Sequence, residues 1–434
     1  MPRSHPSITI LVGAVVAASI LVLSACAPEP EPAATETATA APETPAPEPY
    51  AGPLHFVGDE LDWFLLTADE IAATIPGSAD IAEPDASLVQ VSDGFGSVLQ
   101  PEICTVFLTE ASLGSIGART VAWTGAAGDQ RDGVLRVLQF ADEAQAQNRM
   151  DDYAAAAGAC SDFSIDGQAS SYAHTVVDDG DGVRAMAGAL RFSQEAGADD
   201  QGNTYFGIAS VGNVLVEFWQ PFAGEPTLDD AAAADLLSDR VAQARDRLVE
   251  ELTATPPAAE EDMPDVDPAA PWSAWEIGFD GIGPLRVGEE LDDVLAAAPG
   301  AEIVDTGIGE SQLTSPEGST RLTVTPEENG SAVATLRAGV IGLYGEAPPD
   351  GSVLPRAGGV GVGDPVTSAV AAFPQGTAVR IVSAGLYSYE VATRDGRVIL
   401  FHTDREVAED GAMIVGITAE DATLRREYTF RGTL

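Results

Sequence analysis

Three cysteines, four histidines and a complete lack of lysine define the chemistry available to this 434-residue chain. The cysteines are Cys26, Cys104 and Cys160, and every basic side chain other than histidine is an arginine. Without lysine, the chain has no P-loop lysine, no Schiff-base lysine and no Ser-x-x-Lys nucleophile. The sequence therefore excludes several classes of enzyme.

The histidines form no local metal motif. His55, His174 and His402 are widely separated in the sequence, and no His-Glu-x-x-His segment occurs. A Gly-x-Ser-x-Gly nucleophile elbow is also missing from the sequence. We therefore expect no catalytic residue, no metal site and no cofactor, and we predict that the protein is not an enzyme. An exported hydrolase whose site is dispersed through the fold is the alternative.

The N-terminal segment has the pattern of an export signal. Arg3 and His5 precede an apolar run from Ile8 to Leu23, which has the length of a signal-peptide core and is short for a membrane span. The run ends at Leu23-Ser24-Ala25-Cys26, which resembles the lipobox of bacterial lipoproteins. The resemblance implies that residues 1–25 are removed and that Cys26 carries a lipid. An ordinary signal peptide, or an uncleaved anchor with an incidental cysteine, is the alternative.

Composition predicts where the protein is located and which classes of partner it can bind. Residues 26–53 are rich in Ala, Pro, Glu and Thr, which predicts an extended acidic tether. Lipid on Cys26 implies attachment to the extracytoplasmic face of a bacterial cell membrane. The net charge of -47 repels phosphate backbones and anionic headgroups, so we expect no nucleic-acid partner and membrane contact only through the lipid anchor.

Two cysteines remain once Cys26 is assigned to lipid. An even pair in an exported protein is most simply a disulfide, here between Cys104 and Cys160. Two separate buried thiols are the alternative.

A second Pro-rich acidic stretch, residues 254–271, divides the rest of the chain into two predicted domains, 54–253 and 272–434. In the first domain, a capping box at Thr67 and apolar periodicity predict a helix, a strand, a second helix, a meander of strands and a closing helix. The predicted helices begin at Thr67, at Asp142 and near Thr227 and Asp229. The predicted strands are 134–140, 184–192, 205–211 and 214–220, with Gly212-Asn213 as a tight turn between the last two. This order indicates an α+β fold, with an antiparallel sheet and helices on one face.

The second domain contains a sequence repeat. Residues 288–299 align without a gap to residues 363–374, at a constant offset of 75. Apolar residues fall at i, i+3, i+4 and i+7 in both segments, and strand-like pieces follow each of them. We expect a duplicated α+β unit, each copy a helix followed by an antiparallel meander, over about 276–345 and 352–434.

The first domain resembles the PknH-like extracytoplasmic sensor domain of actinobacterial membrane serine/threonine kinases. The resemblance rests on four short motifs, which are Leu65–Ile71, Pro101-x-x-Cys104, Phe140-Ala141 before an Ala-rich helix, and Cys160 after that helix. It implies an α+β domain with a ligand-binding cleft. Members commonly have two disulfides, whereas this chain can form one.

The repeat is similar to those of β-lactamase inhibitory proteins and of small outer-membrane assembly lipoproteins. Val287-Gly288 and Val362-Gly363 carry this similarity, although the Met-Thr that often follows the glycine is missing. The similarity implies protein recognition on a sheet surface, without chemistry.

Aromatic side chains supply the candidate ligand cleft in the first domain. The candidates, with core packing as the alternative for each, are Trp123, Tyr172, Tyr205, Trp219 and Phe222. We therefore expect a cell-envelope lipoprotein that acts as a non-enzymatic sensor or adaptor for an unknown small molecule or envelope protein. Inhibition of an envelope enzyme through the repeat domain is a further alternative.

Overall fold

The computed structural model of the protein describes residues 48–91, 98–125, 132–178, 180, 182–192, 203–257, 266–307, 309–345 and 347–425. The predicted α+β class is confirmed, because large antiparallel sheets are flanked by a few helices within these residues. Cys26, the predicted signal peptide, most of the predicted tether and residues 258–265 lie outside the described residues. The predictions of export, lipidation and domain boundaries therefore stay predictions.

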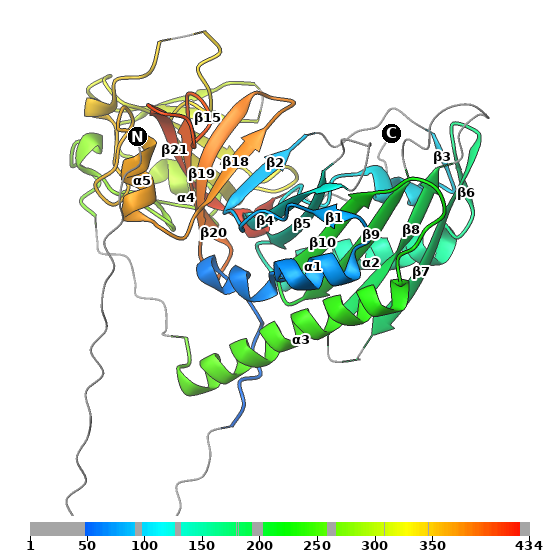
Figure 1. The fold of residues 1–434 in the computed structure, drawn as a ribbon. Helices are drawn as coiled ribbons and strands as arrows, with labels where there is room; N and C mark the ends of the chain where they lie inside the picture. Colours follow the sequence, from blue (N-terminus) through cyan, green and yellow to red (C-terminus); the bar gives the residue numbers. More distant parts are fainter. Residues whose placement is uncertain are drawn as a thin grey trace, which may run out of the picture. The chain divides into compact units, whose positions relative to one another are not determined.

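The first sheet has nine strands in the order β1-β4-β5-β10-β9-β8-β7-β6-β3, and every neighbouring pair is antiparallel (Figure 1). Strands β8 to β10 lie within a residue of where the sequence predicts strands, and Gly212, with φ of 53°, makes the tight turn between the last two. The strands are β1 (Ser78–Ala79), β3 (Leu99–Gln100), β4 (Gly117–Gly125), β5 (Gly133–Gln139), β6 (Phe163–Ile165), β7 (Gln168–Asp178), β8 (Arg184–Phe192), β9 (Thr204–Val211) and β10 (Val214–Pro221).

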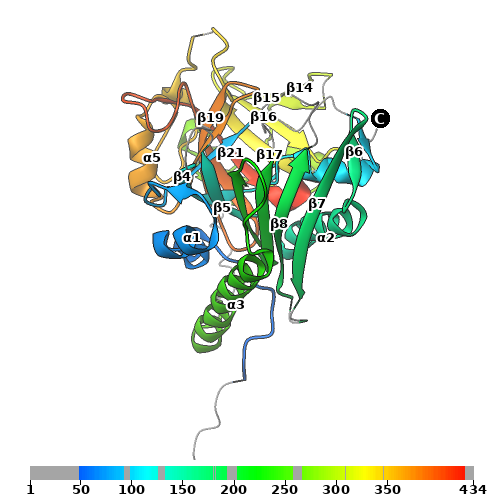
Figure 2. The same ribbon diagram turned by 45° about the vertical axis from the view of Figure 1, so that its right-hand side comes forward.

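Helices cover both faces of the first sheet, so the prediction of helices on one face is wrong. Helix α3 (Asp230–Ala254) lies across β7, β8 and β9, whereas α2 (Glu143–Ala159) packs on the opposite face (Figures 1 and 2). Strand β10 shows the reason, since Val216 is buried with α3 and Leu215 is buried with α2. Successive residues of a strand point to opposite faces, and here both faces are apolar.

Two short elements before the first sheet join the α3 side. They are the 3-10 helix η1 (Gly58–Phe64) and helix α1 (Ala68–Thr74). The capping box predicted at Thr67 is confirmed, because the Thr67 hydroxyl accepts from the Glu70 backbone N–H and the Glu70 carboxylate accepts from the Thr67 N–H. Asp142 and Asp229 cap α2 and α3 through their side chains.

The predicted disulfide between Cys104 and Cys160 is present, with Cα atoms 5.9 Å apart. Cys104 belongs to the 3-10 helix η2 (Glu102–Leu108), and Cys160 directly follows α2. Both cysteines are fully buried. The bond therefore fixes η2 against the helix that covers one face of the first sheet.

The second sheet also has nine strands, in the order β14-β15-β16-β17-β21-β20-β19-β18-β2. Helices α4 (Leu291–Ala296) and α5 (Val366–Ala372) pack on one face of it, around Leu336 and Ile417. The strands are β14 (Glu302–Asp305), β15 (Ser311–Thr314), β16 (Arg321–Pro326), β17 (Val333–Gly339), β18 (Thr377–Ile381), β19 (Leu386–Ala392), β20 (Arg397–Thr403), β21 (Ile414–Asp421) and β2 (Ser87–Gln90).

Short elements precede each helix of this half. The strands β11 (Ile277–Gly278), β12 (Gly281–Ile282) and β13 (Leu285–Arg286) form a small antiparallel sheet. The 3-10 helix η3 (Trp272–Ala274) precedes α4 and the 3-10 helix η4 (Gly351–Val353) precedes α5, whereas η5 (Ala422–Leu424) follows β21.

The elements of the second half recur at the offset of the sequence repeat. Helix α5 begins 75 residues after α4, and strands β18 and β19 begin 75 residues after β14 and β15. The bridge between Ala357 and Val360 likewise follows the Ile282–Leu285 pair at the same spacing. The two meanders join at the antiparallel pair of β17 and β21. The similarity to β-lactamase inhibitory proteins is not tested by these bounds and stays a prediction.

One short segment of the first half belongs to both sheets. Asp85 bridges Thr120 of strand β4, and the next residues form β2, which pairs in parallel with β18 from Ser87 to Gln90. The segment therefore connects the first sheet to the edge of the second, and residues Pro47–Leu434 form one compact unit.

Polar contacts reinforce this junction. The hydroxyl of Thr377, at the start of β18, accepts a hydrogen bond of 3.0 Å from the backbone N–H of Ala118 in β4. Arg425 holds both carboxylate oxygens of Glu420 and donates to the carbonyls of Gly114 and Ser115. Both Thr377 and Glu420 are buried, so these bonds lie in the interior between the sheets.

None of the helices formed by the described residues is long and apolar enough to span a membrane.

The Thr377 hydroxyl bond gives a test of the junction. We expect Thr377→Val to lower the free energy of unfolding by about 1–3 kcal/mol, because the buried Ala118 N–H loses its acceptor while the shape is kept. Thr377→Ser keeps the hydroxyl and is the matched control, with a smaller loss. Urea unfolding followed by circular dichroism measures both, and equal losses for the two variants would contradict the assignment.

Candidate functional site

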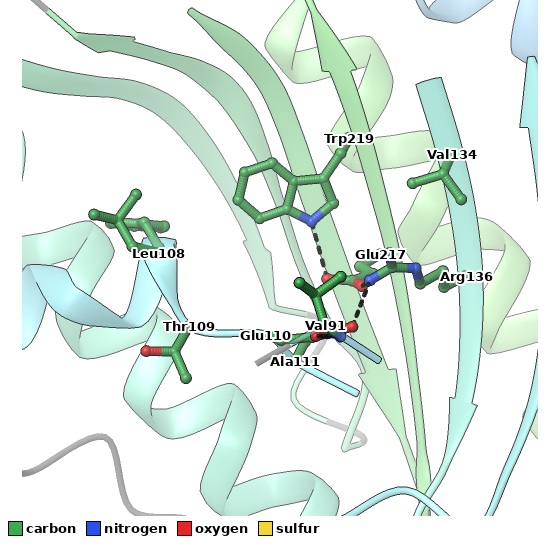
Figure 3. A pocket seen from close by; sticks show the side chains of 10 residues that line it. Val91, Leu108, Thr109, Glu110, Ala111, Val134, Arg136, Glu217 and Trp219 are labelled. Carbon is green, nitrogen blue, oxygen red and sulfur yellow. Dashed lines mark hydrogen bonds and ion pairs between the residues drawn. The ribbon is translucent and has the colours of Figure 1, made fainter. Parts of the chain in front are cut away.

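A pocket lies beside η2, on the α2 face of the first sheet. Its volume is about 530 Å³, which is within the range of small-molecule sites. Strands β5 and β10 supply one wall, and η2 with the residues after it supplies the other (Figure 3). The lining residues are Val91, Phe107, Leu108, Thr109, Glu110, Ala111, Val134, Arg136, Glu217 and Trp219.

A cluster of charged side chains lies at one end of this apolar pocket. The Arg136 guanidinium is 3.2 Å from one oxygen of Glu217, and the Trp219 indole N–H donates to the other oxygen over 3.1 Å. Glu110 is also close, with an oxygen 3.6 Å from Arg136. Figure 3 shows these side chains converging from β5, β10 and the segment after η2.

Burial strengthens the electrostatic interactions within this cluster. The Glu217 side chain is only 1% exposed and that of Glu110 is 10% exposed, so neither carboxylate is screened well by water. Burial, together with the nearby Glu217 carboxylate, raises the pKa of Tyr153 in α2 well above its usual range. The cluster therefore carries two carboxylates and one guanidinium, with one negative charge in excess.

A cluster of packed aromatic side chains supports the apolar walls of the pocket. The Trp219 ring packs against Phe206 of β9, with centroids 4.7 Å apart. Phe206 in turn contacts Phe107 of η2 and Tyr153 of α2, at 5.8 Å and 5.4 Å. Since Phe206 and Phe107 are fully buried, the two walls are held by one continuous core.

The register of the sheet places the charged pair. Arg136 lies directly opposite Glu217, and Val134 lies directly opposite Trp219, in the antiparallel pair of β5 and β10. Residues two apart on a strand share a face, so all four side chains face the pocket. Glu110 is positioned separately, because it accepts bonds from the Val91 backbone N–H and the Ser112 hydroxyl.

The structure places only one of the five predicted cleft aromatics in this pocket, and it is Trp219. Trp123 is buried on the α3 face and donates to Gln220, while Tyr205 stacks on Phe222 at 4.1 Å in the same core. Tyr172 is buried on the α2 face and stacks on His174 at 4.8 Å. For these four residues the structure favours the core-packing alternative.

Sequence reasoning missed Glu110, Arg136 and Glu217. Each is one of many charged residues in the chain, and Arg136 and Glu217 are 81 residues apart in the sequence. A signal was nevertheless present for two of them, because Arg136 and Glu217 each interrupt an apolar strand. A charge inside a buried strand calls for a charged partner on a neighbouring strand.

The three histidines do not come together. His402 lies on β20, where its ring bonds the Thr418 hydroxyl at 2.8 Å, whereas His174 lies on β7 and His55 precedes η1. Burial of the ring, with a smaller contribution from Arg337, lowers the pKa of His402 to about 3. Within the described part of the chain, no group of three or more His, Cys, Asp or Glu side chains is arranged to hold a metal ion.

A smaller hollow of about 300 Å³ lies between the end of α3 and the turn after β19. Its lining includes Glu60 and Arg394, which form an ion pair with each other. Arg394 also donates to the His55 carbonyl, so this polar hollow is part of the contact between the two halves of the chain.

No family model matches the chain, and no curated protein matches it. Among solved structures, the extracellular domain of PknH from Mycobacterium tuberculosis is 12% identical and covers 47% of this chain and 100% of its own, with a TM-score of 0.29. A putative uncharacterized protein from Mycobacterium smegmatis, the Rv0999 ortholog, is 13% identical and covers 43% of this chain and 97% of its own, with a TM-score of 0.24. The interpretation of the pocket therefore rests on its own residues.

The buried ion pair gives a test of the site. We expect Arg136→Met to lower the free energy of unfolding at pH 7 by about 3 kcal/mol, because Glu217 stays buried without its cation.

The matched control for Arg136→Met is Arg191→Met. Arg191 pairs with Glu225 at the surface, where such a change costs about 0–1 kcal/mol. Chemical unfolding at pH 7 measures the loss of stability in both variants. A loss for Arg136→Met that is as small as that of the control would contradict the buried-pair assignment.

Proposed function

We propose that the protein is a lipid-anchored binding protein of the bacterial cell envelope, which holds a small amphipathic molecule in the pocket between η2, β5 and β10. The single observation that carries this proposal is the pocket itself, about 530 Å³ of mostly apolar lining with one buried charged cluster at its end. This combination is typical of sites that bind a small molecule by shape and by a few polar contacts.

The arrangement of the cluster favours binding over catalysis. Both oxygens of Glu217 accept hydrogen bonds, from Arg136 and from Trp219, so the carboxylate is held in place by its neighbours. The described lining residues include no histidine, cysteine or serine, and the Thr109 hydroxyl in the lining donates to the Thr105 carbonyl. A sensor or adaptor role is consistent with such a site.

The proposed location rests on the sequence pattern at Cys26. Its lipobox-like context supports a lipid anchor, and the following Pro-rich acidic residues support a tether of the folded part to the membrane.

Lipidation is tested by mass spectrometry of the full chain expressed in an actinobacterial host. We expect the N-terminal peptide from the membrane fraction to begin at Cys26 with a diacylglyceryl group attached. The Cys26→Ala variant should carry no lipid. It should either be cleaved and leave the membrane fraction, or remain uncleaved and keep its leader. Recovery of an unmodified Cys26 peptide from the membrane would contradict the anchor.

Ligand binding is tested with N-phenyl-1-naphthylamine, a neutral probe whose fluorescence rises in apolar sites. We expect saturable binding of one probe per chain, with an affinity reduced about tenfold or more in Trp219→Ala, because the indole forms a large part of the wall. Trp63→Ala is the matched control, since Trp63 packs on the α3 side of the sheet.

Two results would overturn the binding proposal. One is probe binding that is absent, or that is equally weakened by the two tryptophan variants. The other is turnover of an ester, glycoside or phosphate substrate that Glu217→Gln abolishes, which would assign the pocket to a hydrolase.

A further inference from the structure

We infer that the ligand of this pocket is an organic cation, an apolar body that carries a protonated amine or a quaternary ammonium group. The inference rests on the proposed function, and it specifies the chemical class of the molecule that the same pocket would take.

The charged side chains of the pocket favour a cationic ligand. Glu110 and Glu217 both approach Arg136, at 3.6 Å and 3.2 Å, so one guanidinium faces two carboxylates. A buried cluster with one negative charge in excess is stabilised by a cation and destabilised by an anion. An anionic ligand would also have to compete with two resident carboxylates for the same arginine.

The hydrogen bond of Trp219 also favours a cationic ligand. The Trp219 N–H donates to the Glu217 carboxylate, and the ring lines the pocket. A carboxylate acceptor increases the electron density of the indole, and tryptophan is the side chain whose ring face attracts cations most strongly. The ammonium group of a ligand would therefore be attracted both by the ring and by the carboxylates next to it.

The remaining lining residues favour an apolar body for the ligand. Phe107, Leu108 and Val134 offer no charged group, which suits an aromatic or aliphatic body of the ligand. The whole chain carries a net charge of -47, so its field raises the local concentration of cations around the mouth of the pocket.

The experiment uses three probes that share a phenylalkyl body and differ in charge. They are 4-phenylbutyltrimethylammonium, 4-phenylbutanol and 5-phenylpentanoate, each used to displace N-phenyl-1-naphthylamine from the full chain. We expect the ammonium compound to displace the dye at a concentration about tenfold or more below that of the alcohol, and the carboxylate to be the weakest of the three.

A variant that lacks the negative charge of Glu110 tests whether this carboxylate causes the preference for the cation. Glu110→Gln removes one negative charge, keeps an oxygen that can accept from the Val91 N–H, and offers an amide N–H that can donate to the Ser112 hydroxyl. We expect it to weaken binding of the ammonium compound about tenfold more than binding of the alcohol. Glu83→Gln is the matched control, because Glu83 is exposed and is not among the residues that line the pocket.

The outcomes separate this inference from the proposed function. Equal displacement by the ammonium compound and the alcohol, tighter binding of the carboxylate, or an ammonium affinity that Glu110→Gln leaves unchanged would each overturn the cation inference while the pocket remains a binding site. Failure of the dye and of all three probes to bind would instead overturn the proposed function.

Discussion

The burial of one carboxylate governs the arrangement of the site. Glu217 is almost completely removed from water, and a buried charge is tolerated only with a charged or hydrogen-bonding partner. Arg136 on the neighbouring strand and Trp219 on the same strand supply these partners. A shift of the β5–β10 register by one residue would turn Arg136 toward the α3 core, so the ion pair and the sheet register depend on each other.

The opposite wall of the pocket depends on a covalent constraint. The Cys104–Cys160 bond spans 56 residues and attaches η2 to the end of α2, and closing a loop of this length is worth about 4 kcal/mol in the chain-entropy description. Phe107, three residues after Cys104, then packs into the aromatic core that also supports Trp219. The pocket stays open between two walls because each wall is fixed to the same core by different means.

Local signals in the sequence predicted local structure. The Thr67 capping box and the Gly212-Asn213 turn depend on residues within a few positions of each other, so the sequence alone reveals them. The pocket could not be predicted in this way, because Arg136 and Glu217 meet only after the strands between them have been ordered. Aromatic residues were a poor guide to it, since large rings are favoured in cores and in sites alike.

Strand β2 was also beyond prediction, because it is four residues long and pairs with a strand of the other half of the chain. It nevertheless connects the pocket to the second sheet. The Gln90 side chain donates to the Ser112 carbonyl and the Val91 N–H donates to Glu110, while the backbone of β2 pairs with β18. Glu110 therefore cannot move far without straining bonds to the end of β2. Glu110 is thus bonded to the segment whose backbone pairs with the edge of the second sheet, so the pocket and the junction of the two sheets share these hydrogen bonds.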